Sequence, residues 1–293
     1  MENKRTIKIQ WLFTILAPAA FFLGMQLFAM AVVMVIYCLG FIPDLLQVSG
    51  EAEVDFLLSQ VANGIDNMTF VAEVFSQVYG VICFAIWYHF SSRKKNKQSK
   101  NKLNLKSVCY IIGLGISIEL FVGYILVIAE KFLPNVMKEY EELLESAGLN
   151  EISIGILLTA VILAPIVEEL AFRGCAISMG ERSGCPFWII NIIQSAAFGA
   201  AHMNWVQSSY AFFLGLFLGY CYHKYHSVKA SVLLHFIFNM FGTVITTLIE
   251  GIAIMNLAIV NYVLFAVSII TTIVFTILIS KDKKIMHIKE VEM

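Results

Sequence analysis

Charged residues are few in this 293-residue chain, and their charges nearly cancel. Lys, Arg, Asp and Glu make up 14% of the sequence, and the formal net charge is −1 at pH 7. A nucleic-acid-binding protein needs a basic surface to neutralise phosphates. The six cysteines show no CxxC and no Cys/His metal spacing, and most fall in apolar runs, where cysteine behaves as a small reduced hydrophobic residue. We therefore expect no nucleic-acid partner, no disulfide framework and no cysteine-metal site.

Other common signatures are missing too. No HExxH motif occurs, and there is no clear internal repeat or low-complexity tract. Apolar sequence dominates instead: 59% of the residues are hydrophobic and the mean hydropathy is +0.79. Soluble domains are only about 45–50% apolar. We therefore expect an integral membrane protein.

The first apolar run follows three basic residues, Lys4, Arg5 and Lys8, as in a secretory signal peptide. The run continues from Trp11 to about Leu39, whereas the apolar part of a signal peptide has about 7–15 residues. We interpret this run as an anchored first span.

Eight apolar segments are long enough, or nearly so, to cross a ~30 Å hydrocarbon core with about 20 residues each. Their approximate limits are 11–39, 68–90, 107–130, 154–178, 187–203, 208–222, 230–250 and 254–280. The sixth is short and could be tilted or merged with its neighbour. The segments 51–62 and 133–147 are amphipathic and are predicted to lie on the outer surface. The predicted fold is all-α: a polytopic membrane helical bundle with about eight transmembrane helices.

The charged residues predict the orientation of the spans. Of the 20 Lys and Arg residues, only Lys131 and Lys138 fall on the proposed outer side, and Arg173 lies within or beside the fourth span. The outer loops are acidic. Because basic loops stay in the cytosol, we expect both termini to be cytosolic. The lack of targeting signals favours a bacterial plasma membrane.

Three regions follow from this layout. Residues 1–150 hold three N-terminal transmembrane helices, a basic cytosolic loop at 91–106 and the acidic outer loops. Residues 151–250 hold the core helices, and residues 251–293 hold the last transmembrane helix and a basic cytosolic tail. We interpret the basic loop as a topology determinant that also binds anionic membrane lipid.

Costly polar residues stand inside the predicted spans of the middle region. An ionisable side chain in a spanning helix costs roughly 3 kcal/mol on insertion scales, so each is a functional-site hypothesis. Six such groups on neighbouring spans indicate chemistry inside the membrane: Glu168, Glu169, Arg173, His202, His235 and Asn239.

The spacing of the first three groups predicts their contacts. Glu169 and Arg173 are four residues apart and share a helix face, so an ion pair keeps both in hydrocarbon at least cost. Bracing of the helix alone would also explain this pair. Glu168 points about 100° away and needs another partner, a water-filled pocket or protonation. Pro165 removes a backbone hydrogen bond and favours a kink, which would admit water beside Glu168.

The remaining groups repeat this pattern. His235 and Asn239 are four apart in the seventh span and face one direction. A lone His–Asn pair can simply hold helices together, and a lone histidine such as His202, packed on Phe198, is often an interface residue. Three polar faces in one region favour a shared site over these separate explanations.

These residue types suit hydrolysis of a peptide bond. A glutamate and a histidine can activate water, while a second histidine and an asparagine amide can stabilise the oxyanion. Glu168, His202 and His235 could also bind zinc. The spacing leaves metal dependence open.

Three short motifs resemble the signatures of the CPBP family, also called Abi or CAAX-protease-like intramembrane proteases. EExxxR stands at 168–173, FxxxH at 198–202 and HxxxN at 235–239. Each motif is weak alone, but all three in order on predicted spans are specific. The resemblance covers about residues 150–245, so it makes 151–250 the catalytic core.

The resemblance implies an intramembrane endopeptidase, of glutamate or metalloprotease type, whose site is reached from the cytosolic side. Its substrate would be a peptide or a protein tail, and no cofactor is required in this interpretation, with zinc as the alternative. The roles carried over by position are water activation by Glu168 and His202, oxyanion binding by His235 and Asn239, and support by Glu169 and Arg173. Bacteriocin processing or self-immunity and signalling-peptide processing stay open, as does the oligomeric state.

Two other classes of function compete with this one. A non-enzymatic immunity or scaffold protein could bind a peptide or partner in the same cavity. A proton or solute transporter could use Glu119, Glu168 and the histidines as a relay, but the inverted repeat of many transporters is not evident. Glu73 and Gln77 stand near an outer boundary, where solvation explains them.

Straight helices would not bring the site together. At about 1.5 Å rise per residue, Glu168 falls near mid-membrane, His202 toward the outer side and His235 toward the inner side. Convergence therefore requires tilted or kinked spans, with breaks available at Pro165, Gly174, Gly180 and Pro186.

Overall fold

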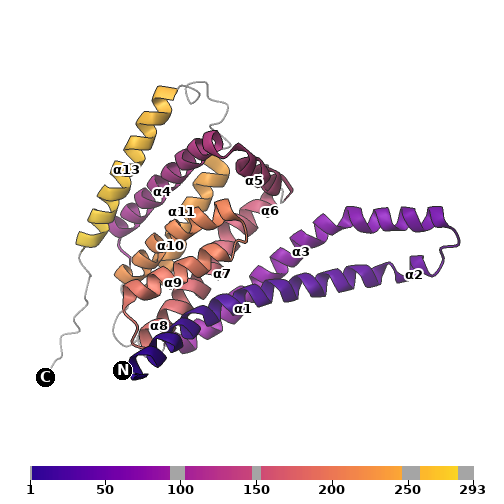
Figure 1. Cartoon of the computed structure of the whole chain (residues 1–293), viewed down its shortest axis with the longest axis horizontal. Coiled ribbons are helices and arrows are strands. Elements are labelled where there is room, and N and C mark those ends of the chain that lie inside the picture. Colours follow the sequence, from indigo (N-terminus) through magenta and orange to yellow (C-terminus); the bar gives the residue numbers. More distant parts are fainter. Residues whose placement is uncertain (1, 93–102, 147–152, 246–257, 283–293) are drawn as a thin grey trace.

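A computed structural model describes residues 2–92, 103–146, 153–245 and 258–282 (Figure 1). All regular structure in these ranges is helical, which confirms that the fold is all-α, while the orientation of the termini stays a prediction. The N-terminal part consists of α1 (Glu2–Gly40), α2 (Ile42–Leu45), α3 (Glu51–Ser92), α4 (Leu105–Phe132) and α5 (Pro134–Ser146). The rest consists of α6 (Ile154–Ile156), η1 (Leu157–Leu163), α7 (Ala164–Glu168), η2 (Glu169–Ile177), α8 (Ser178–Arg182), α9 (Phe187–Ala200), α10 (Trp205–Tyr225), α11 (Val228–Met240), η3 (Phe241–Ile245) and α13 (Ala258–Lys281).

Within the described residues, five helices are long and apolar enough to cross a membrane: Ile9–Leu45, Glu51–Ser92, Leu105–Phe132, Ile154–Arg182 and Ile259–Lys281. They contain the predicted spans 11–39, 68–90, 107–130 and 154–178 and most of 254–280. The other three predicted spans are mainly helical where the structure describes them, and residues 246–250 of the seventh lie outside the described ranges. However, α9 has only 14 residues and Val228–Val244 is also short, while α10, with 21 residues, is less apolar. An integral membrane protein is supported, and the count of eight spans stays a prediction.

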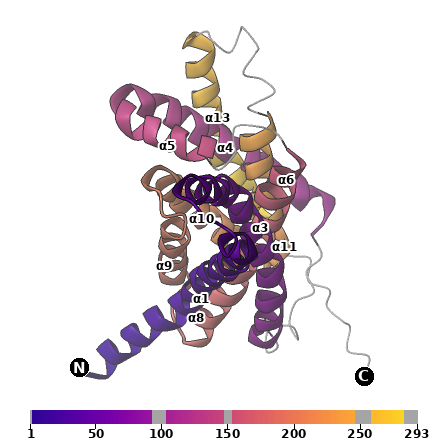
Figure 2. The ribbon, with the colours of Figure 1, turned by 90° about the vertical axis from the view of Figure 1, so that its right-hand side faces the viewer.

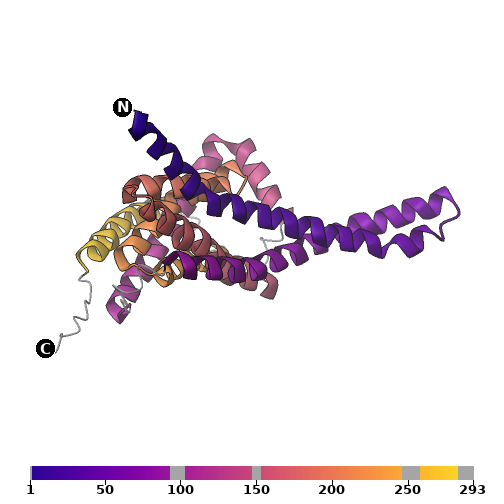
Figure 3. The ribbon, with the colours of Figure 1, turned by 90° about the horizontal axis from the view of Figure 1, so that it is seen from below.

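The segment 51–62, which we predict to lie on the outer surface, forms the first part of a longer helix. It is continuous with the second span, because α3 runs unbroken for 42 residues. Gly64 explains the close pairing of α3 with α1. A side chain at that position would collide with Tyr37, whose hydroxyl donates to the Val61 carbonyl at 3.2 Å. Figures 1 and 3 show the resulting α1–α3 hairpin extending well past the other helices.

An apolar core joins the central helices. Buried side chains from α4, η2, α9 and α10 meet in one cluster, among them Leu114, Phe172, Phe198, Leu214 and Leu218. Figure 2 shows the molecule with the hairpin tip facing the viewer. In this view α1 and α3 lie in front of the core, with α9 and α10 on one side and α11 on the other. Gly219 allows α9 and α10 to approach closely. The Asn191 side-chain oxygen occupies the space that a side chain at this position would need.

One end of the bundle collects the helix ends that carry most of the basic residues that the structure describes. Trp11 near the start of α1 donates to the Ser183 carbonyl, and Arg182 donates to the Phe90 carbonyl. Beside them, Asp282 accepts hydrogen bonds from Ser107 at 2.6 Å and from the Tyr225 hydroxyl at 3.0 Å. We call this the basic end. α5 and α6 lie at the opposite end (Figure 1).

Candidate active site

The helical rod from Ile154 to Arg182 changes its winding on both sides of Pro165. Residues Leu157–Leu163 and Glu169–Ile177 are π-helical, and Pro165 lies in the first turn of the short α-helical stretch between them. π-Helical segments place each hydrogen bond between residues five apart and occur often at functional sites. The predicted disturbance at Pro165 therefore takes the form of two π segments that flank Glu168.

Asn239 satisfies a carbonyl group that this winding leaves free. In the π register, the Ala164 N–H bonds the Thr159 carbonyl, so the next carbonyl, of Ala160, would need an N–H from Pro165. Proline has none. The Asn239 side-chain amide donates to the Ala160 carbonyl at 2.8 Å instead. This bond fixes the Asn239 amide and leaves its second N–H available to another acceptor.

Glu169 and Arg173 form the predicted ion pair. Their Oε1 and Nη1 atoms are 2.9 Å apart, and both side chains are fully buried. Arg173 also donates to the Gly215 carbonyl at 3.2 Å and lies 4.3 Å from the ring centre of Phe198. The guanidinium is thereby locked between two helices and an aromatic face.

His235 contacts both glutamates of the first motif. Its Nδ1 is 2.9 Å from Glu169 Oε1, the oxygen that also binds Arg173. Its Nε2 is 3.7 Å from Glu168 Oε2. An ionised Glu169 can only accept a hydrogen bond, so His235 Nδ1 must carry the proton and donate it to Glu169 Oε1. The chain Arg173–Glu169–His235 therefore holds the imidazole with Nε2 directed at Glu168.

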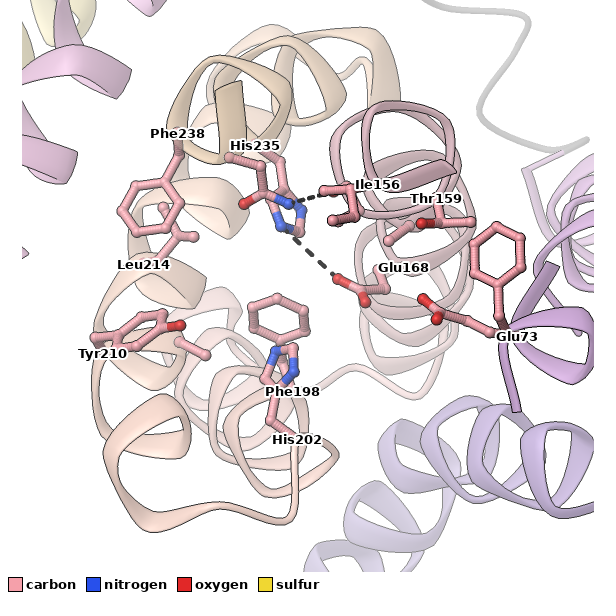
Figure 4. Close-up of a pocket in the computed structure, with 15 residues that line it drawn as sticks. Glu73, Ile156, Thr159, Glu168, Phe198, His202, Tyr210, Leu214, His235 and Phe238 are labelled. Atoms are coloured by element: carbon pink, nitrogen blue, oxygen red, sulfur yellow. Dashed lines mark hydrogen bonds and ion pairs between the residues drawn. The ribbon is translucent and has the colours of Figure 1, made fainter. Parts of the chain in front are cut away.

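Glu168, His202, His235 and Asn239 line one cavity of about 270 Å³. In Figure 4 the Glu168 carboxylate points into this space between His235 and His202. Phe198 packs edge-on against both imidazoles, with ring centres 5.2 Å from His202 and 5.7 Å from His235. The structure therefore brings the predicted residues together, although straight helices would place them at different depths. Their catalytic roles stay predictions.

Three further polar residues line this cavity, and the sequence pattern assigns none of them to the site: it explains Glu73 by solvation, and Glu73 is exposed. Glu73 of α3, Thr159 of η1 and Tyr210 of α10 also line it, and Tyr210 shares a hydrogen bond of 3.1 Å with Tyr140 of α5. Glu73 carried a usable signal, because it is a carboxylate within a predicted span with an amide, Gln77, one turn later. Glu119 is buried on α4 but is not among the residues that line the cavity.

The cavity extends from the middle of the bundle toward the end opposite the basic end. At about 1.5 Å rise per residue, Glu168 is roughly 20 Å of helix from both Ile154 and Arg182, so it stands at the middle of this rod. Most of the other lining residues lie beyond this middle, toward the start of the 154–182 rod and of α10 and toward the ends of α9 and α11. The resemblance implied access from the cytosolic side. This placement favours access from the opposite side if the basic end is cytosolic.

The geometry does not offer a ready zinc site. Within residues 2–92, 103–146, 153–245 and 258–282, no three His, Cys, Asp or Glu side chains are arranged to hold a metal ion. Nδ1 of His235 is engaged by Glu169, and the Glu168 and His235 atoms that face each other have no third ligand of this kind in place. Glu168, His202 and His235 share the cavity without forming a ligand set.

Comparison with known proteins agrees with the motifs. Residues 150–241 match the family model described as type II CAAX prenyl endopeptidase Rce1-like. Searches of curated proteins and of solved structures gave no match. The matched region contains all six polar residues of the three motifs and most of the cavity. Over residues 150–241, this chain is therefore similar to the CAAX-protease-like, or CPBP, family.

Proposed function

We propose that this protein is an intramembrane endopeptidase that hydrolyses a peptide bond of a peptide or a protein tail. The observation that carries the proposal is the shared cavity of Glu168, His202, His235 and Asn239, inside the helical core of a membrane protein. A carboxylate, two imidazoles and a fixed amide around one cavity are the groups that peptide hydrolysis requires.

Glu168 is the general base in this mechanism. Its carboxylate removes a proton from a water molecule in the cavity while the water oxygen adds to the substrate carbonyl carbon. His202, on the other side of the cavity, orients that water. The tetrahedral intermediate then collapses, the C–N bond breaks, and the proton held by Glu168 passes to the leaving amine.

His235 and Asn239 stabilise the oxyanion of the intermediate. With both ring nitrogens protonated, His235 donates from Nδ1 to Glu169 and presents Nε2–H to the cavity. The second N–H of Asn239 is the other donor, because the first is bound to Ala160. Donors fixed before reaction stabilise a developing charge without reorganisation, and the loss of one such donor typically costs about 10²–10³ in rate.

The reaction in this proposal is of the glutamate type and needs no metal. The support is geometric, since Glu168 and the two histidines are not arranged as a ligand set. Dialysis of the purified protein against a zinc chelator should leave turnover unchanged. Loss of turnover on chelation, with recovery on zinc addition, would assign the metalloprotease type to the same three residues.

The setting of the activity is also part of the proposal. The substrate is a peptide or a protein tail that reaches a cavity within the membrane, and bacteriocin, self-immunity and signalling peptides are candidate substrates. A bacterial plasma membrane and direct contact with lipid fit the sequence, whose basic residues gather at one end of the bundle. Neither a prenyl group nor a particular cleavage sequence is specified by the residues of the cavity.

Terminal-peptide mass spectrometry tests the proposal. Membranes and medium from cells that express the wild type would be compared with those from Glu168→Gln and His202→Ala cells at matched protein levels. Glu51→Gln, on exposed α3 residue Glu51, is the matched control for the loss of one carboxylate. We expect protein termini that occur with the wild type and the control but disappear in both cavity variants.

An unchanged set of termini in all four strains would contradict the enzyme assignment. If a host phenotype such as peptide immunity also survived in Glu168→Gln, a non-enzymatic immunity or scaffold protein that binds a peptide in the same cavity would be favoured.

A further inference from the structure

The active-site cavity contains a second carboxylate, contributed by a helix outside the family match. Glu73 of α3 lines the cavity together with Glu168, and its carboxylate points toward Glu168 in Figure 4. Gln77, which is buried one turn later, donates to Glu73 Oε1 at 3.0 Å. The Glu73 carboxylate is therefore held in place at the edge of the reaction centre.

Glu73 has no cationic partner among the described residues. No lysine or arginine lines the cavity. Both nitrogens of His235 already face Glu168 and Glu169, and the fully buried Arg173 is bound to Glu169 and the Gly215 carbonyl. The nearest partner that the structure gives to Glu73 is thus the neutral amide of Gln77.

Glu73 and Glu168 place two carboxylates on one cavity. Carboxylates that share a site favour a binding partner of positive charge and orient it. A substrate chain that places its carbonyl group at Glu168 comes close to Glu73, because both side chains line the same 270 Å³ space. A positive group on that chain would complete the missing ion pair.

We propose that Glu73 determines substrate specificity by binding a positively charged group of the substrate next to the scissile bond. This group is a lysine or arginine side chain or a free amino terminus. The inference rests on the proposed peptidase function and adds to it a substrate class. Gln77 acts as a positioning residue that orients the Glu73 carboxylate.

The test uses the termini produced by the full-length protein in membranes. Wild type, Glu73→Gln and the control Glu51→Gln would be compared. We expect wild-type-dependent sites to have Lys or Arg within about three residues of the cut, which is the reach of ~10 Å of extended chain. Sites within a few residues of a free amino terminus would identify the terminus as the bound cation instead. Either class should fall at least about tenfold in Glu73→Gln.

A purified comparison separates recognition from folding. A peptide made from the strongest cleaved site would be assayed with its lysine replaced by norleucine, or with its amino terminus acetylated. We expect Glu73→Gln to raise KM for the charged peptide about tenfold with kcat nearly unchanged. With the wild type, the neutral peptide should show the same raised KM. Glu73→Gln should raise KM for the neutral peptide little further, because the change in the peptide and the change in the protein remove the same interaction.

Two results would overturn the inference while leaving the peptidase in place. One is a set of wild-type-dependent sites without enriched positive charge. The other is an equal loss at all sites in Glu73→Gln, which would indicate a structural role. If the wild type produces no terminus that Glu168→Gln lacks, the proposed function itself fails and the inference falls with it.

Discussion

At the scale of single residues, Glu169 connects the buried cation of the site to its imidazole. One of its oxygens binds both Arg173 and His235 at 2.9 Å, so a single carboxylate balances the buried cation and orients the imidazole. Residues that hydrogen-bond a reacting side chain from behind fix its tautomer and its orientation. Their removal therefore displaces the reacting atoms.

Removal of Arg173 alone should destabilise the protein. In Arg173→Met, Glu169 stays buried without its cation, and breaking a buried pair in this way typically costs about 3–5 kcal/mol of the free energy of unfolding. Thermal unfolding in detergent would measure it. Lys138→Met is the matched control, because Lys138 and Glu142 form an exposed ion pair with the same i, i+4 spacing; little change is expected there.

The double variant Glu169→Leu/Arg173→Met separates stability from orientation. Replacing both members of a buried pair by apolar residues is often neutral or stabilising, so the unfolding temperature should recover. Turnover should not, since His235 would lose the partner of its Nδ1 atom. A double variant that cleaves at the wild-type rate would contradict the positioning role of Glu169.

At the scale of elements, the rod from Ile154 to Arg182 makes the site possible. Its two π-helical segments flank the stretch that holds Pro165 and Glu168, and its free Ala160 carbonyl anchors Asn239 from α11. A regular α-helix over the same residues would give that carbonyl an intrahelical partner four residues later. The irregular winding therefore couples two motifs that lie about 70 residues apart in the sequence.

Pro165→Ala tests this coupling. The restored N–H at position 165 can bind the Ala160 carbonyl and so displace the Asn239 amide. We expect unchanged or greater thermal stability, because the substitution removes a helix-breaking ring, together with a turnover reduced about tenfold or more by misplacement of the amide. Pro134→Ala, at the first residue of α5, should leave turnover unchanged. Equal turnover in the two variants would argue against the anchoring role of the Ala160 carbonyl.

At the scale of the whole molecule, the bundle has two unlike ends. The basic end joins the N-terminal part of α1, the ends of α3, α8, α10 and α13 and the start of α4. The cavity lies toward the other end, next to α5, through the Tyr140–Tyr210 hydrogen bond. If the basic end faces the cytosol, as basic loops do, substrates enter from the non-cytosolic side.

Single-cysteine labelling tests this arrangement. In a background in which the six native cysteines are replaced, Met203→Cys and Lys106→Cys would be exposed to a membrane-impermeant maleimide in intact cells. Met203 is exposed beside His202, and Lys106 is exposed at the basic end. We expect Met203→Cys to react at once and Lys106→Cys to react only after permeabilisation. The reverse pattern would support the cytosolic access that the family resemblance implied.

Much of the fold and the identity of the site residues could be predicted from the sequence. Hydropathy predicts a helical membrane protein, because a helix satisfies the polar groups of its own backbone within lipid. The i, i+4 spacing settles the Glu169–Arg173 pair, which the structure contains. Costly polar groups in apolar runs mark the site residues for the same energetic reason.

Only the tertiary structure decided how those residues meet. The depth of each residue along a straight helix separates Glu168, His202 and His235, and their convergence depends on the tilt and winding of three helices. Packing also brings Glu73 into the cavity from α3, and it extends α3 through the segment 51–62. Periodicity within one helix describes its own faces, whereas contacts between helices depend on shape and crossing angle, which an almost uniformly apolar sequence does not encode locally.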